Sequence, residues 1–229
     1  MFGQQETAPY RTIQVAASVS VGERLAFLKK VYGLLAASML SATVGAVMGM
    51  GPLLPVVGSL GFLSILFFFG SFMFLMFVQR KPGLNMVALF SFTTIAGLMI
   101  GPMLNMYVAA GSGFIVLEAL GLTTVTFVGL TAYVIFSKKD FSFMSGFLMT
   151  GLIILIVGGL INLFLQSSMM HFVFSGAGVL LFSGFILYDT SNILRNYSTD
   201  DYVSATVALF LDVFNLFLHL LSFLGLARD

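Results

Sequence analysis

The sequence has no cysteine and no tryptophan, and only 8% of its 229 residues are charged. Without cysteine there are no disulfides, no thiolate metal sites and no thiol nucleophile. An ordinary soluble domain carries about 25% charged residues, so this chain has too little charge to coat a soluble globule. Ten Lys and Arg against nine Asp and Glu leave no basic excess, which excludes a nucleic-acid binder.

Apolar residues dominate instead: 59% of the chain is hydrophobic, with 26 Phe and 14 Met. Short breaks rich in Gly, Pro or charge separate seven apolar segments. Each has about 20 to 26 residues, enough to cross ~30 Å of hydrocarbon at 1.5 Å per residue. We therefore expect an all-α integral membrane protein. It has a polar N-terminal tail, 1–30, and a membrane domain, 31–229, with spans near 31–50, 56–78, 84–105, 113–136, 141–165, 169–194 and 203–226.

The basic residues predict how the spans are oriented. If the spans alternate in direction, all of the ten Lys and Arg except Arg228 lie on the side of the N-terminus. Positive residues in short loops stay in the cytoplasm. The N-terminus is therefore expected in the cytoplasm and the C-terminus on the far side of the membrane. No apolar stretch follows an early basic cluster, so the tail is not a cleaved signal peptide.

Glycines mark two spans for close packing. Gly45 and Gly49 in span one, and Gly97 and Gly101 in span three, have the small-xxx-small spacing. This spacing lets two membrane helices approach closely. Gly is also simply common in membrane helices, so the alternative that these residues have no packing role stays open.

Two acidic residues are expected at similar depth in neighbouring helices. At 1.5 Å per residue, Asp189 lies about 8 Å inside the cytoplasmic end of span six and Asp212 about 13 Å inside that of span seven. Two carboxylates at low dielectric cannot both ionise cheaply, so they share a proton and act as a pH sensor. Once deprotonated, they offer the hard oxygen ligands that suit Ca²⁺. The alternative is a structural pair that bonds two helices or reaches cytoplasmic water.

Further polar residues accompany the pair. Asn215 and His219 lie three and seven residues after Asp212 on one helical face, and Asn192 lies three after Asp189. These stripes indicate a wetted surface or a polar partner, although His219 alone is also explained by an interhelical hydrogen bond. Glu118, near the outer end of span four, either binds a cation or extends its side chain to the outer surface.

Motifs for catalysis are absent, so we expect a protein that is not an enzyme and needs no cofactor, with Ca²⁺ only as a bound or permeant ion. One remote alternative is an intramembrane aspartyl protease. Tyr188-Asp189 resembles the first motif of those enzymes, but their Gly-x-Gly-Asp and Pro-Ala-Leu motifs are missing here.

Two segments near the C-terminus carry a family resemblance: Gly184-Phe-Ile-Leu-Tyr-Asp-Thr-Ser-Asn-Ile-Leu194, and Ala208-Leu-Phe-Leu-Asp-Val-Phe-Asn-Leu-Phe-Leu218 followed by Leu224-Gly225. They resemble the signature of the Bax inhibitor-1 family (transmembrane Bax inhibitor motif proteins). The match extends over about residues 25–229 and is closest to the bacterial members. Gly101-Pro-Met-Leu-Asn-Met-Tyr107 and Leu224–Asp229 are similar to the branch known as modulators of FtsH protease.

The resemblance implies a fold in which span seven is central and the first six wrap it. It also implies a pH-sensitive Ca²⁺ leak governed by Asp189 and Asp212. In the calcium-leak members an arginine near the cytoplasmic end of span two locks onto the span-six aspartate, and Arg80 is the candidate here. Two functions stay open. One is this leak; the other is a regulator that binds and inhibits a membrane-bound AAA protease through the tail, 1–30.

Overall fold

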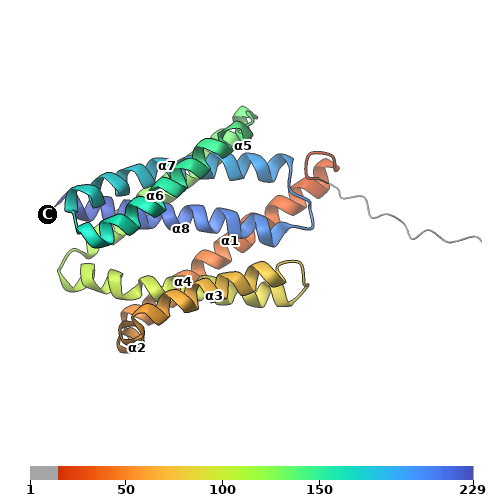
Figure 1. Ribbon diagram of the computed structural model, residues 1–229. Coiled ribbons are helices and arrows are strands. Elements are labelled where there is room, and N and C mark those ends of the chain that lie inside the picture. Colours follow the sequence, from red (N-terminus) through yellow and green to blue (C-terminus); the bar gives the residue numbers. More distant parts are fainter. Residues whose placement is uncertain (1–14, 229) are drawn as a thin grey trace, which may run out of the picture.

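A computed structural model describes residues 15–228, and in this range the chain is helical with no strand. The helices are α1 (Val21–Met50), α2 (Leu54–Leu60), α3 (Phe62–Val78), α4 (Leu84–Ala109), α5 (Gly113–Ser137), the short 3-10 helix η1 (Ser142–Met144), α6 (Ser145–Leu165), α7 (Ser168–Arg195) and α8 (Tyr202–Leu226). The long helices form one elongated bundle (Figure 1). The expected all-α class is confirmed.

Among residues 15–228, six helices are long and apolar enough to cross a membrane: α1, α4, α5, α6 extended by η1, α7 and α8. The expected span 56–78 differs, because α2 and α3 meet at an angle of 96°. The bend lies at Gly61, whose φ of +49° is the left-handed conformation that glycine adopts without strain. The expected span 56–78 therefore consists of two helices, and the described residues contain six spans, or seven if the bent pair is one span.

The N-terminal boundary also differs from the expectation. Helix α1 begins at Val21 and continues through Lys30 without a break, so residues 21–30 belong to the first long helix. Ser20 starts the helix: its Oγ accepts from the N–H of Glu23, and the Glu23 carboxylate accepts from the N–H of Ser20. This capping box satisfies two backbone donors that a helix N-terminus otherwise leaves unpaired. Residues 1–14 of the expected tail lie outside the described residues.

Glycines join α1 to α4, as the spacing predicts. A Cβ at Gly45 or Gly49 would overlap the backbone of α4, and one at Gly97 or Gly101 would overlap the backbone of α1. Because lipid tails are as apolar as the helices, membrane helices associate by such close packing and not by exclusion from water. The hydroxyl groups of Ser41 and Thr94 add a hydrogen bond of 2.6 Å across the same contact.

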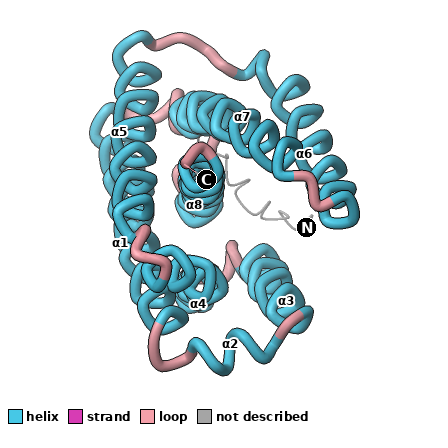
Figure 2. Tube along the Cα trace, turned by 90° about the vertical axis from the view of Figure 1, so that its left-hand side faces the viewer, coloured by secondary structure: helices cyan, strands magenta, loops and turns pink. Residues whose placement is uncertain are grey.

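Helix α8 is the most buried of the long helices. It packs against α7, α5, α1 and α4, and among the described residues it makes no close contact with α2, α3 or α6. In Figure 2 it lies between the α5–α7 side and the α1–α4 side of the bundle. That the other six spans wrap this helix in the membrane stays a prediction.

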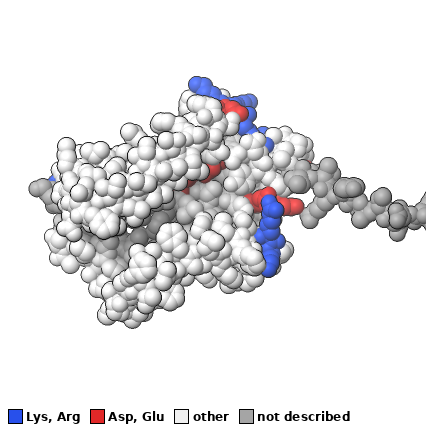
Figure 3. Space-filling model, in the orientation of Figure 1, with Lys and Arg blue, Asp and Glu red and all other residues white. Residues whose placement is uncertain are grey.

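Charge is concentrated at the ends of the bundle. On the face in Figure 3, Lys and Arg gather toward the end of the bundle at which α1 begins. The long sides are almost uncharged and carry many exposed Phe, Leu, Ile and Val side chains. Such an apolar belt between charged ends is what a bilayer requires. The direction in which the bundle crosses the membrane remains the prediction made from the basic residues.

Replacing Gly97 with Ala should weaken the α1–α4 contact, since the added methyl group meets the Ala42 carbonyl. Overpacking of this kind costs about 1 to 3 kcal/mol, measurable as a lower midpoint of unfolding in detergent. Gly129→Ala is the matched control, because nothing lies within 4 Å of a Cβ built there. Equal destabilisation by both substitutions would contradict the packing role of Gly97.

A reporter enzyme fused after Asp229 should be active in the periplasm and not in the cytoplasm. The reason is that the positive residues lie near the N-terminal side, which requires an odd number of crossings and therefore that α2 and α3 together cross once. The complementary fusion before Met1 is the control and should report the cytoplasm. Cytoplasmic activity of the C-terminal fusion would mean that α2 and α3 enter and leave on one side.

Candidate functional site

Asp189 of α7 and Asp212 of α8 lie side by side, as the sequence predicts. Their carboxyl groups are close enough to share a hydrogen bond. Asp212 is 5% exposed and Asp189 is partly buried. The Oδ2 atom of Asp212 has no hydrogen-bond partner among residues 15–228. We refer to Asp189 and Asp212 as the aspartate pair.

The chemistry of such a pair follows from its surroundings. Phe210, Phe214, Leu209 and Leu216, which flank Asp212 on α8, are all buried apolar residues. No basic side chain of the described residues pairs with the two acids there, so the arrangement favours one proton held between two carboxyl groups. A cation that replaces the proton would meet carboxylate oxygens, the ligands of Ca²⁺.

The pair alone does not make a closed metal site. Among residues 15–228 there is no group of three or more His, Asp and Glu side chains that could hold a metal ion. Calcium takes six to eight oxygen ligands, and two carboxylates supply at most four. A calcium ion at the pair would therefore keep part of its water shell, which suits passage better than storage.

Three hydroxyl groups lie together beside the turn of α7 that carries Asp189. The hydroxyl of Tyr32 on α1 lies near those of Thr131 on α5 and Thr190 on α7. Each is buried and lacks a well-formed hydrogen bond within the described part of the chain. Sequence reasoning did not single out these residues, because isolated Thr and Tyr are common in membrane helices and only the fold brings them together.

Arg80 does not contact the aspartate pair. Its Nε lies 3.4 Å from Oδ1 of Asp201, in the loop between α7 and α8. The neighbouring Gln79 accepts a hydrogen bond of 2.7 Å from the hydroxyl of Ser204, at the start of α8. Arg80 therefore fastens the end of α3 to the α7–α8 loop, instead of locking onto Asp189.

Glu118 lies apart from the pair, at the other end of the bundle. It is exposed and forms an ion pair of 2.8 Å with Arg228, near the C-terminus. Asn192 is also engaged elsewhere, because its Oδ1 accepts a hydrogen bond of 2.8 Å from Asn196 at the end of α7. Of the predicted supporting residues, these two are not placed at the aspartate pair.

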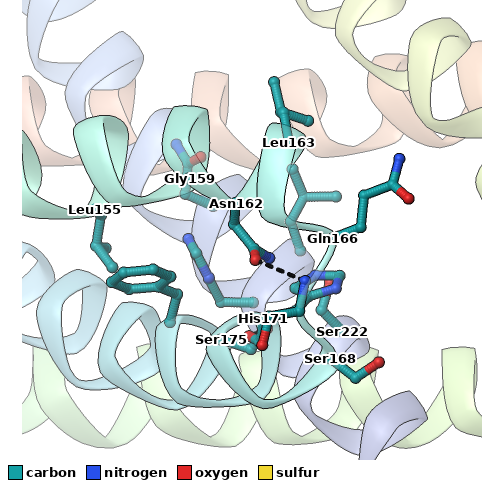
Figure 4. Close-up of a pocket in the computed structure, with 14 residues that line it drawn as sticks. Leu155, Gly159, Asn162, Leu163, Gln166, Ser168, His171, Ser175 and Ser222 are labelled. Carbon is teal, nitrogen blue, oxygen red and sulfur yellow. Dashed lines mark hydrogen bonds between the residues drawn. The ribbon is translucent and has the colours of Figure 1, made fainter.

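Asn215 and His219 extend the polar stripe of α8 toward the far end of the bundle. Both line a pocket of about 580 Å³ between α6, α7 and α8. Figure 4 shows Asn162, His171 and Ser222 converging on this pocket. The His219 ring lies over Gly178, where a Cβ would overlap it, and stacks on Phe182 with ring centroids 5.4 Å apart. The sequence analysis also offered an interhelical hydrogen bond as the role of His219. No such bond is among the contacts of His219 within the described residues.

Tyr197 lies on the side of the aspartate pair that faces the start of α1, and the sequence analysis gave no indication of this residue. Tyr197, in the α7–α8 loop, lies near enough to Asp189 and Asp212 to be affected by their charge. The residue just before α1, Ala16, is fully buried against this loop. No sequence signal identifies this contact, since it joins segments about 180 residues apart.

Comparison with known proteins identifies relatives over nearly the whole chain. A family model described as "Inhibitor of apoptosis-promoting Bax1" matches residues 24–229. An uncharacterized membrane protein of Vibrio cholerae is 45% identical, over 88% of this chain and 90% of its own length. Mouse Protein lifeguard 4 is 38% identical, over 91% of this chain and 88% of its own length. The Modulator of FtsH protease YccA of Escherichia coli is 37% identical, over 85% of this chain and 86% of its own length.

Proposed function

Because the chain belongs to the Bax inhibitor-1 family, we propose that it is a multi-pass regulator of the bacterial inner membrane that modulates a membrane-bound AAA protease. The observation that carries this proposal is the 37% identity, over most of both chains, to a protein named as a modulator of FtsH protease. The absence of catalytic motifs in the sequence is consistent with a regulator instead of an enzyme. The N-terminal segment is the part of the chain that would meet the protease in the cytoplasm.

Deleting residues 2–14 should abolish modulation while leaving the bundle folded, because the capping box and the turn at Val15–Ser18 remain. The measurement is the rate at which the protease degrades a membrane substrate in proteoliposomes, with and without the variant. A chain carrying the same residues 2–14 in scrambled order is the matched control for tail length. Full modulation by the deleted chain would exclude the tail as the contact.

The aspartate pair favours a second function, a pH-sensitive leak of Ca²⁺ or another cation. Burying a carboxyl pair in a membrane is costly, which makes the pair a candidate site for a proton or an ion. In this proposal the protonated pair holds α7 and α8 together, and loss of the proton leaves two negative charges that admit a cation. The polar stripe Asp212, Asn215 and His219 then connects the pair with the pocket of Figure 4.

Replacing either aspartate with Asn should abolish the pH dependence of calcium flux in proteoliposomes, because a single carboxyl has no partner with which to share a proton. The two single variants should behave alike, and the double variant should add little, since coupled groups are not additive. The readout is the pH midpoint of the flux. A midpoint in Asp189→Asn within a few tenths of a unit of the parent would show that the pair is structural.

Glu118→Gln is the matched control for the loss of an acid in a long helix. Glu118 is exposed and paired with Arg228, far from the pair, so its variant should change the amount of flux at most and not its pH midpoint. The two functions separate in the same preparations: deleting residues 2–14 should leave the flux intact, whereas Asp189→Asn should leave tail-dependent modulation intact.

A further inference from the structure

Between the aspartate pair and the α7–α8 loop lie two further side chains, those of Ile193 and Tyr197. Asp189 and Ile193 are four residues apart and lie on one side of α7, and Tyr197 lies in the loop just after the helix ends at Arg195. Ile193 is fully buried, and Tyr197 packs on the same apolar cluster as Ile193 and Val203. Ile193 and Tyr197 therefore fill apolar space between the pair and this end of the bundle.

The titratable groups around the Tyr197 hydroxyl are Asp189 and Tyr188 of α7, Asp212 of α8 and Asp201 of the loop. Burial raises the pKa of Tyr197 first, and the charges of Asp189 and Asp212 raise it further. The hydroxyl thus stays neutral throughout the range in which carboxyl groups titrate. A neutral aromatic ring next to two acids excludes water without adding a charge.

The segment before α1 holds the backbone of Tyr197. The N–H of Ala16 donates to the carbonyl of Tyr197 over 2.9 Å, and Val15 forms an antiparallel bridge with Ser198. Ser18 closes a turn on Val15 through its N–H and its hydroxyl, each 2.9 Å from the Val15 carbonyl. We call residues Val15–Ser18 the N-terminal turn.

The same loop is fastened from its other side. The ion pair of Arg80 with Asp201 and the hydrogen bond from Ser204 to Gln79 join it to the end of α3. Those two contacts leave Tyr197 itself unrestrained, because they lie four and seven residues further along the chain. Nearer to Tyr197, its own N–H donates to the carbonyl of Asn192 over 3.3 Å, and the N-terminal turn holds its carbonyl.

We infer that Tyr197 is a positioning residue that closes the aspartate pair toward the cytoplasm, and that the N-terminal turn holds it closed. This inference deepens the proposed function and rests on the aspartate pair being its working site. It joins the two activities in one part of the molecule: the tail proposed to meet the protease continues directly into the turn that holds Tyr197. A partner that displaces residues 15–16 releases Tyr197 and opens the pair to water.

Cysteine accessibility tests the closure by Tyr197 without relying on flux. The chain has no cysteine, so Ile193→Cys introduces a single thiol between Tyr197 and the pair. In inside-out vesicles, a membrane-impermeant thiosulfonate should label this thiol slowly. Adding Tyr197→Ala should speed labelling about tenfold or more, because the local opening that the ring prevents becomes frequent. Tyr197→Phe, which keeps the ring, should restore the slow rate.

A second pair of variants tests the N-terminal turn. Ala16→Pro removes the N–H that bonds Tyr197 while fitting the second position of the turn, and it should speed labelling as Tyr197→Ala does. Ala16→Gly keeps the N–H and should label slowly. Tyr133→Ala, an exposed tyrosine of α5, is the control for loss of an aromatic ring. Labelling at the parent rate in both Tyr197→Ala and Ala16→Pro would overturn the inference.

The pH profile of flux separates a positioning role from a structural one. Tyr197→Ala should move the pH midpoint of calcium flux by more than a few tenths of a unit, whereas Tyr133→Ala should not. If Tyr197→Ala speeds labelling but Asp189→Asn keeps the parent pH midpoint of flux, the closure by Tyr197 is supported and the pH-sensitive leak is overturned. If Asp189→Asn shifts the pH midpoint of flux while Tyr197→Ala leaves the labelling rate unchanged, the leak is supported and the closure by Tyr197 is overturned.

Discussion

An aspartate among apolar helices needs a neighbour that takes up its charge or shares its proton, and in this bundle that requirement falls on the contact between α7 and α8. Asp212 is the deeper of the two acids, and none of the described basic side chains reaches it. Asp189 is its counterpart on α7. The rest of the α7–α8 contact is consistent with this demand: Gly178 lets the His219 ring lie flat against α7, so the helices stay close over their outer halves as well.

The packing of α1 on α4 supports the same arrangement from the other side. The four interlocked glycines bring these helices close enough for α1 to reach α8, where the Thr206 hydroxyl donates to the carbonyl of Val31 over 3.3 Å. Because α1 also continues back to the N-terminal turn, its position on α4 determines where that turn meets the α7–α8 loop. A contact in the middle of the membrane thus sets the geometry of a contact at its surface.

Much of this could be predicted from the sequence, where the signal is local. Gly, Pro and charge punctuate the apolar runs, so the last five spans were placed within a few residues of their helices. Asp189 and Asp212 could be paired because a short loop makes their helices neighbours. Gly61 could not be recognised as a bend, since a glycine inside an apolar run is compatible with a straight span. Tyr197 and Ala16 were missed because their contact depends on how distant segments meet.

The bend at Gly61 leaves α3 with 17 residues, a length of about 25 Å against ~30 Å of hydrocarbon. A span shorter than its bilayer draws the two leaflets together around it, at a modest cost for each ångström of hydrophobic mismatch. If α3 is the part of the bent pair that crosses, the large exposed side chains of α3 would face this thinned annulus. The molecule would then deform the lipid along α3, and a bilayer of short acyl chains would accommodate that flank with less strain than a thick one.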